Sequence, residues 1–76
     1  MKELIEFVAR SIVEQPDAVE VEEESDGDRV ILHLYVADDD MGKVIGKQGR
    51  IANAMRALVK VAAIRNDTYV NLEIGR

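Results

Sequence analysis

The residues with the clearest chemical potential lie between 42 and 51, in the run Gly-Lys-Val-Ile-Gly-Lys-Gln-Gly-Arg-Ile. Gly46 and Gly49 lack a Cβ, so the backbone between them can bend sharply and a sugar-phosphate chain can approach it without collision. Lys47 and Arg50 add positive charge, and Gln48 can donate a hydrogen bond to phosphate or ribose. A helical pattern begins at the exit of this turn, where free amides and the helix dipole favour an anion. The spacing therefore predicts a turn that holds a phosphate backbone.

The flanks of the turn supply a third cation and aliphatic surface. Lys43 precedes the turn, and Val44, Ile45 and Ile51 offer apolar surface on which bases could lie. Aromatic platforms are scarce, because the chain has one Phe, two Tyr and no Trp. One of Val44 and Ile45 is expected to pack in the core instead, and the role of Ile51 stays open between core and ligand. The candidate binding residues are Lys43, Val44, Ile45, Gly46, Lys47, Gln48, Gly49, Arg50 and Ile51.

Charge is distributed very unevenly along the chain, whose formal net charge is -5. Residues 1–40 carry three basic and thirteen acidic side chains, whereas residues 41–76 carry seven basic and two acidic ones. Between Gly42 and Asn66 there is no acidic residue, while Arg56, Lys60 and Arg65 add to the cations of the turn. These three are either solvated helix charges or part of a basic surface. A polyanion responds to the local field within about 10 Å, so the acidic total does not exclude nucleic acid.

Other kinds of chemistry have weaker support. The spacing of a nucleotide-binding P-loop is not met, because three residues separate Gly42 from Gly46 and Gln48 stands where Ser or Thr would bind magnesium. His33 has no second imidazole or cysteine to form a metal site with, and it is expected to be an exposed strand residue. The Asp38–Asp40 run is expected to be a solvated, capping loop. We predict no enzymatic activity, no cofactor and no metal.

Hydrophobic periodicity predicts the elements that position the turn. Apolar residues at helical spacing indicate a helix over 2–14, ended by Pro16, and a further helix from Ile51 onward. Alternation indicates strands over 19–22, 30–37 and 69–74, with a hairpin turn at 25–28. A short helical turn over 41–45 is expected to be capped by Asp40. The predicted buried stripes of the helices are Leu4, Ile5, Val8 and Ile12, then Ile51, Met55, Leu58 and Ala62.

The predicted order is thus helix, strand, strand, helix, helix, strand, with one apolar sheet face packed beneath three helices. This is a two-layer α+β domain with a three-stranded mixed sheet, spanning residues 1–76 as a single domain. The order and the Gly-x-x-Gly turn together resemble the prokaryotic-type, or type II, KH domain over essentially the whole chain. In length and in the run 44–56 the chain resembles small bacterial proteins that consist of one such domain. One departure is Ala52, because many KH signatures have a large aliphatic residue at that position.

The resemblance implies a single-stranded RNA-binding protein, an RNA chaperone or regulator, whose Gly-Lys-Gln-Gly loop clamps about four nucleotides. It also implies pairing with a second copy or with a larger multidomain KH protein, and a link to cell elongation. The alternative is a dimerisation or docking module with little direct RNA role, for which Ile31, Tyr35 and Tyr69 on the uncovered sheet face are candidates. No apolar run approaches the roughly 20 residues of a membrane span, so we expect a cytoplasmic protein without membrane contact.

Overall fold

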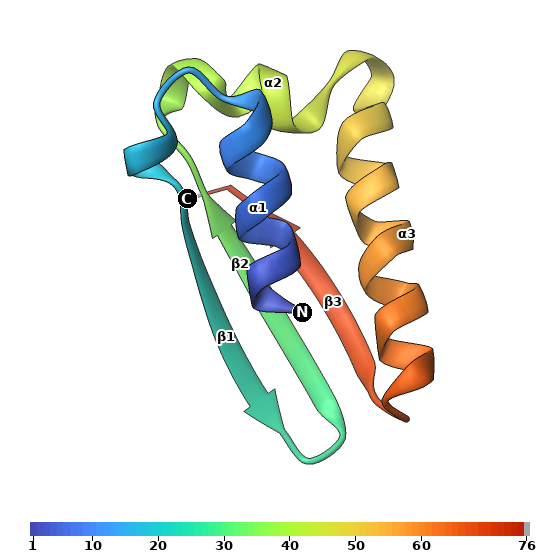
Figure 1. Ribbon diagram of the computed structural model, residues 1–76. Coiled ribbons are helices and arrows are strands. Elements are labelled where there is room, and N and C mark those ends of the chain that lie inside the picture. Colours follow the sequence, from blue (N-terminus) through green and yellow to red (C-terminus); the bar gives the residue numbers. More distant parts are fainter. Residues whose placement is uncertain (76) are drawn as a thin grey trace.

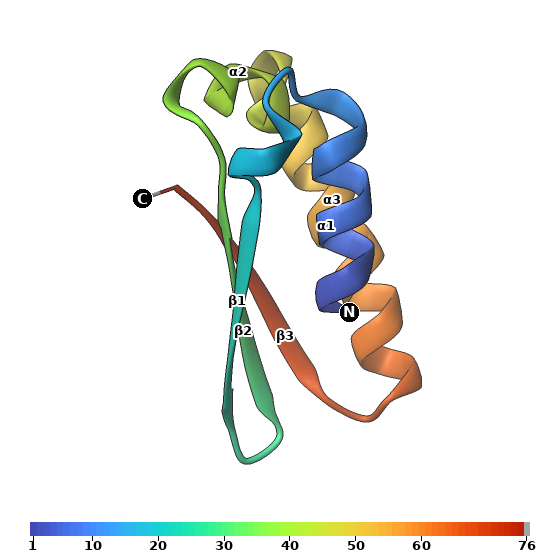
Figure 2. The same ribbon diagram turned by 60° about the vertical axis from the view of Figure 1, so that its left-hand side comes forward.

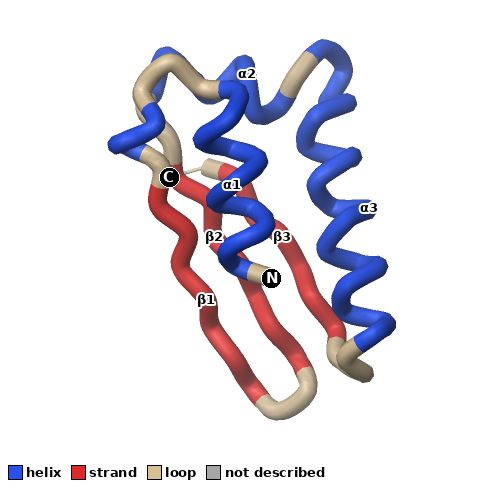
Figure 3. Tube along the Cα trace, in the orientation of Figure 1, coloured by secondary structure: helices blue, strands red, loops and turns tan. Residues whose placement is uncertain are grey.

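The computed structural model describes residues 1–75, and its elements follow the predicted order. The helices are α1 (Lys2–Ile12), α2 (Met41–Ile45) and α3 (Arg50–Arg65), and the strands are β1 (Glu20–Asp26), β2 (Arg29–Tyr35) and β3 (Tyr69–Ile74). Short 3-10 turns at Pro16–Ala18, Asp38–Asp40 and Lys47–Gly49 join them. Figures 1 and 2 show the helices on one face of the sheet, and Figure 3 shows how little of the chain is loop. The predicted α+β architecture is confirmed.

The sheet is mixed, with strand order β1-β2-β3. β1 and β2 form an antiparallel hairpin, and β3 pairs with β2 in parallel after the chain crosses over through α2 and α3. β1 is longer than the predicted strand and carries the Glu22–Glu24 run, and the hairpin turn is formed by Gly27 and Asp28. Gly27 has φ +65°, the left-handed geometry that such a tight turn requires.

The predicted core face of the sheet is confirmed. Leu32 and Leu34 of β2 have no exposed surface, and register places Leu32 beside Leu72 and Leu34 between Val21 and Ile74. Residues between these positions point to the uncovered face, because successive strand side chains alternate. The glutamates of β1 and β3 that lie there are Glu20, Glu22, Glu24 and Glu73.

The predicted helix stripes are only partly confirmed: Ile5 and Met55 are buried and Val8 is partly buried, whereas four other predicted positions are exposed. α1 ends at Ile12 and buries Ile5 and Ala9, while Leu4 and Ile12 are exposed. The residues that α3 buries are Ala52, Met55, Val59 and Ala63, and Ile51 and Leu58 lie outside. Both stripes on α3 fit helical spacing, so the choice depends on how the helix is rotated over the sheet. The rotation adopted buries Ala52 and Ala63, whose small side chains allow the helix to pack closely.

Asp40 does not cap α2 as predicted. Its side chain is almost fully buried, and its two carboxylate oxygens accept hydrogen bonds from the backbone amides of Glu14, at 3.1 Å, and Gln15, at 3.0 Å. The amides belong to the loop that follows α1, so this carboxylate ties the end of α1 to the start of α2. The expectation of a solvated acidic loop therefore fails at Asp40, because its carboxylate is the acceptor for two backbone amides that lie beyond the end of α1.

Candidate nucleic-acid interface

The glycine turn lies between α2 and α3, at the end of the molecule opposite the β1–β2 hairpin (Figure 1). Gly46 ends α2 with φ +76° and ψ 174°, and its amide donates to the Gly42 carbonyl at 2.8 Å. The Gly49 amide then donates back to the Gly46 carbonyl at 3.1 Å, and Gly49 adopts a left-handed conformation with φ +76°. Gln48 is left-handed as well, with φ 57°. The chain therefore reverses within four residues.

The two glycines are required for different reasons. A Cβ on Gly46 would lie 2.5 Å from Cγ1 of Ile51, which is closer than side chains approach. A Cβ on Gly49 would meet only Asn53 Nδ2 at 3.8 Å, an ordinary contact. Gly46 is thus fixed by both packing and backbone conformation, whereas Gly49 is fixed by conformation alone. The outer side of Gly49 is open to an approaching ligand.

The cations of the turn differ in how free they are. Lys47, Gln48 and Arg50 are exposed, and among the described residues neither Lys47 nor Arg50 takes part in an ion pair. Lys43 is different, because its Nζ lies 3.8 Å from a carboxylate oxygen of Glu14. The hydrogen bonds of the turn use the amides of Gly46, Gly49 and Arg50 and do not involve those of Lys47 and Gln48. Two full charges and two further backbone donors thus lie at the start of a long helix.

The aliphatic residues around the turn have separate positions. Val44 has no exposed surface and belongs to the core, so it is the member of the Val44–Ile45 pair that packs inside. It has no surface for a base to contact. Ile45 and Ile51 are each more than one third exposed. Ile51 also packs against Gly46, so one side of the Ile51 side chain is in contact with the turn and the other side is exposed to solvent.

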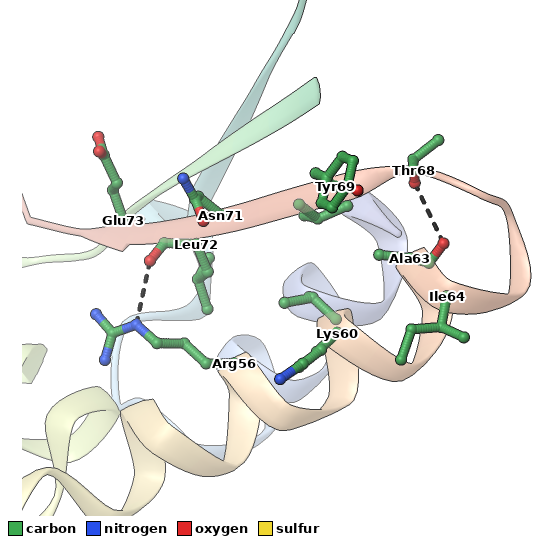
Figure 4. Close-up of a pocket in the computed structure, with 11 residues that line it drawn as sticks. Arg56, Lys60, Ala63, Ile64, Thr68, Tyr69, Asn71, Leu72 and Glu73 are labelled. Carbon is green, nitrogen blue, oxygen red and sulfur yellow. Dashed lines mark hydrogen bonds between the residues drawn. The ribbon is translucent and has the colours of Figure 1, made fainter. Parts of the chain in front are cut away.

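A groove runs between α3 and β3, the strand at the edge of the sheet. It encloses about 610 Å³. It is lined on the helix side by Arg56, Val59, Lys60, Ala63 and Ile64, and on the strand side by residues 68–73. Arg56 lies about 9 Å along the helix from Arg50. Figure 4 shows the Arg56 side chain reaching β3, where its Nε donates to the Leu72 carbonyl at 3.3 Å. Arg56 and Lys60 thus lie at the groove. Asn71 also lines the groove, but the sequence did not identify it, because a polar residue in a strand does not by itself indicate a binding site.

The uncovered sheet face has the opposite electrostatic character. His33 is not exposed as predicted but half-buried, with Nδ1 3.2 Å from Glu73 and Nε2 3.5 Å from Glu24. The pKa of Tyr35 is raised above 10.0, first because Glu22 accepts a hydrogen bond from its hydroxyl and then because of desolvation and nearby carboxylates. Within residues 1–75 no group of three or more potential ligands is arranged to hold a metal ion. The glutamates of this face lie on the side of the sheet opposite α1 and α3 (Figure 2).

No helix among the described residues combines the length and the apolar character that a bilayer crossing requires. The mixed sheet, the three helices on one face and the glycine turn between α2 and α3 together define a type II KH domain. The profile of the "KhpA/KhpB, KH domain" family matches residues 2–74, and the chain belongs to that family. Membership agrees with the expectation that the chain is not an enzyme.

Similar proteins cover nearly the same length. The RNA-binding protein KhpA of Clostridium perfringens strain 13 is 53% identical over 74 residues, which are 97% of this chain and 99% of that protein. The RNA-binding protein KhpA of Clostridium acetobutylicum is 51% identical with the same coverage, and that of Listeria monocytogenes is 42% identical over 97% of both chains. No solved structure was found to match.

Proposed function

We propose that this chain, as one KH domain over residues 1–76, binds single-stranded RNA by clamping its backbone at Gly46–Gly49. The observation that carries the proposal is the surface turn itself, with left-handed backbone at Gly46, Gln48 and Gly49 and exposed Lys47 and Arg50 beside it. The names of the relatives, RNA-binding protein KhpA, support the same polymer. Single strands fit better than duplexes, because their unstacked bases can turn into an adjacent apolar groove.

Each candidate residue then has a defined part. Lys47 and Arg50 neutralise phosphates, and Gln48 donates to a phosphate or ribose. Lys43 contributes when it leaves Glu14 for the RNA, since both partners are surface groups and such pairs are weak. The exposed sides of Ile45 and Ile51 support the bases nearest the turn, and the groove along α3 receives the next ones. Val44 acts only by packing.

The test is the affinity of the purified protein for a labelled octauridine, measured by fluorescence anisotropy. Replacing both Lys47 and Arg50 with Glu should weaken binding by about 100-fold, because two charge-assisted contacts are lost and reversed. The matched control is Arg10→Glu with Arg29→Glu, which changes net charge by the same amount on exposed sites of α1 and β2. Equal losses in both variants, or no loss in the first, would refute a clamp at the turn.

A second candidate function is pairing with another copy of the chain or with a larger multidomain KH protein. The observation favouring it is the set of large apolar side chains exposed on the helices, which are Leu4, Phe7, Leu58, Val61 and Ile64. Phe7 and Val61 on the helices are exposed. Of the three candidates on the uncovered sheet face, Ile31 and Tyr35 are partly buried and Tyr69 is exposed, so we favour the helices as the pairing surface. Leu58 and Val61 lie on the flank of α3 away from Arg56 and Lys60, because each residue advances the helix by about 100°. Pairing through Leu58 and Val61 would therefore leave the groove flank of α3 free, whereas Ile64 also lines the groove.

The proposal extends to the cell in three respects. As the family resemblance implies, the bound RNA would be remodelled or regulated, and the pairing would serve a complex that controls cell elongation. The named relatives are bacterial proteins, and bacterial RNA is made in the cytoplasm, so we place the chain there. RNA recovered after crosslinking in cells, compared between the wild type and the Lys47→Glu, Arg50→Glu variant, would identify the targets.

A further inference from the structure

We propose that the uncovered face of the sheet is a docking surface for a protein partner that presents an extended segment with arginines at alternate positions. This function goes beyond the proposed RNA binding and does not depend on it. The face lies on the side of the sheet opposite α1 and α3 (Figure 2). Three features of the face point to such a partner: its charge, the spacing of its carboxylates, and the rings beside them.

The face carries a large excess of negative charge. The register of the strands places five acidic side chains on it, which are Glu20, Glu22, Glu24 and Asp26 of β1 and Glu73 of β3. Arg29 is the only Lys or Arg in the three strands. Such a surface repels a polyanion, and it also repels the same face of a second copy. The partner that fits this face is therefore cationic.

The carboxylates are spaced in a way that an extended peptide can match. Glu20, Glu22 and Glu24 alternate along β1, so their side chains are about 7 Å apart. Side chains at alternate positions of an extended peptide have the same spacing and point to the same side. Glu24 and Glu73 lie 3.5 and 3.2 Å from the two ring nitrogens of His33, yet their side chains remain 70% and 62% exposed. These two carboxylates are thus positioned and still accessible.

The rings beside the carboxylates favour arginine over lysine. The rings of His33 and Tyr35 are stacked, with centroids 6.4 Å apart and planes 14° from parallel. Tyr69 is 70% exposed on β3. A guanidinium can bind a carboxylate through two parallel N–H groups and stack on an aromatic ring, whereas an ammonium offers only a point charge. A pocket of about 180 Å³ beside the stacked rings can receive such a group, and it is lined by His33, Tyr35, Glu73, Ile74 and Gly75.

The experiment measures binding of the full chain to a fluorescein-labelled peptide of sequence Arg-Ser-Arg-Ser-Arg-Ser-Arg, by anisotropy at about 0.15 M salt. Two comparison peptides have the same charge: one has its four arginines in a row, and the other has lysine in place of arginine. The alternating arginine peptide should bind at least about threefold more tightly than either, because only it matches both the spacing and the rings. Equal affinity for all three peptides, or no binding of any, would overturn the proposal.

The decisive variant is Glu22→Gln with Glu73→Gln, which removes two carboxylates from neighbouring positions of the face. It should bind the alternating peptide at least about fivefold more weakly than the wild type. The matched control is Glu3→Gln with Glu23→Gln, which removes the same charge elsewhere. Glu3 lies in α1, and Glu23 is paired with Leu32 and so lies on the helix side of β1. Equal losses in the two double variants would show that net charge alone attracts the peptide, and would overturn the proposal.

Three further measurements keep the result unambiguous. Thermal unfolding establishes that the double variant is folded, and Glu20→Gln, at an exposed position that leaves the contacts of His33 in place, should weaken peptide binding by about twofold. Sedimentation analysis of Glu22→Gln with Glu73→Gln should show the self-association of the wild type. A shift toward the monomer would assign the face to a second copy, and weaker binding of octauridine would assign it to RNA. Either result would overturn the proposal.

Discussion

Ile51 fills the space beside Gly46 in which any other residue would carry its side chain. A Cβ at Gly46 would lie 2.5 Å from Ile51 Cγ1 and 2.9 Å from the Ile51 amide nitrogen. The backbone of Gly46, with φ +76° and ψ 174°, also belongs to a region that is open almost only to glycine. The first residue of the turn and the first turn of α3 are therefore packed as one unit, and the shape of the clamp depends on both.

Gly46→Ala is expected to lower the free energy of unfolding by about 3 kcal/mol, because it adds both backbone strain and a close contact with Ile51. Urea denaturation measures the change. Gly42→Ala is the matched control. Gly42 lies in α2, where an added Cβ meets nothing within 4 Å, so this change should raise stability by up to about 1 kcal/mol. Similar effects of the two substitutions would contradict the packing described for Gly46.

Asp40→Ala is expected to destabilise the protein by about 3 kcal/mol, since it leaves the amides of Glu14 and Gln15 without their acceptor. Denaturant melts compare it with Asp39→Ala, which alters an exposed neighbour and should change stability by no more than about 0.5 kcal/mol. An Asp40→Ala variant as stable as Asp39→Ala would show that the hydrogen bonds from the loop after α1 to Asp40 do not stabilise the fold.

The affinity for single-stranded RNA is expected to fall with salt at a logarithmic slope of about -2, which corresponds to about three neutralised phosphates. Replacing Lys47 and Arg50 with Glu should bring the slope to about -0.7 or nearer to zero, because at most one phosphate contact then remains. Anisotropy titrations over a range of salt concentrations give both slopes. An unchanged slope in the variant would place the phosphates elsewhere on the molecule.

Leu58→Glu is expected to shift any self-association toward the monomer while the domain stays folded. Leu58 is 45% exposed on α3, so the change leaves the core intact, and a charge at an apolar contact between chains is strongly unfavourable there. Sedimentation analysis measures the shift. Ser25→Glu adds the same charge at an exposed position of β1, the strand at the sheet edge opposite β3. If Leu58→Glu associates as the wild type does, the helix flank is not the pairing surface.

Glu22→Gln is expected to lower the pKa of Tyr35 toward 10.0, because it removes the carboxylate that raises it. The folded-state pKa of the wild type lies above the unfolded value. The stability linked to the Tyr35 proton is therefore fully present below pH 10 and is lost as pH rises through the folded pKa. Tyrosinate absorbance in a Tyr69→Phe background follows Tyr35 alone. A titration that Glu22→Gln leaves unchanged would show that Glu22 is not the cause.

The parts of this fold that depend on local chemistry could be predicted from the sequence. A strand has only two faces, so the alternation around Leu32 and Leu34 assigned the core side of the sheet without ambiguity. The glycines of the turn could also be identified from the sequence, because the positive φ angles of Gly46 and Gly49 favour residues without a Cβ. The type of each element and the place of the turn follow from neighbouring residues alone.

Other features depend on residues that are distant in sequence. α3 has apolar residues around most of its circumference, so periodicity could not decide between Leu58 and Val59 as the buried residue, and contact with the strands decided it. The two partners of Asp40 are 26 and 25 residues away in the chain, and the partner of Arg56 is 16 residues away. Local patterns thus determined the elements and the turn, whereas packing decided helix rotation, the buried carboxylate and the groove, because these depend on which surfaces meet.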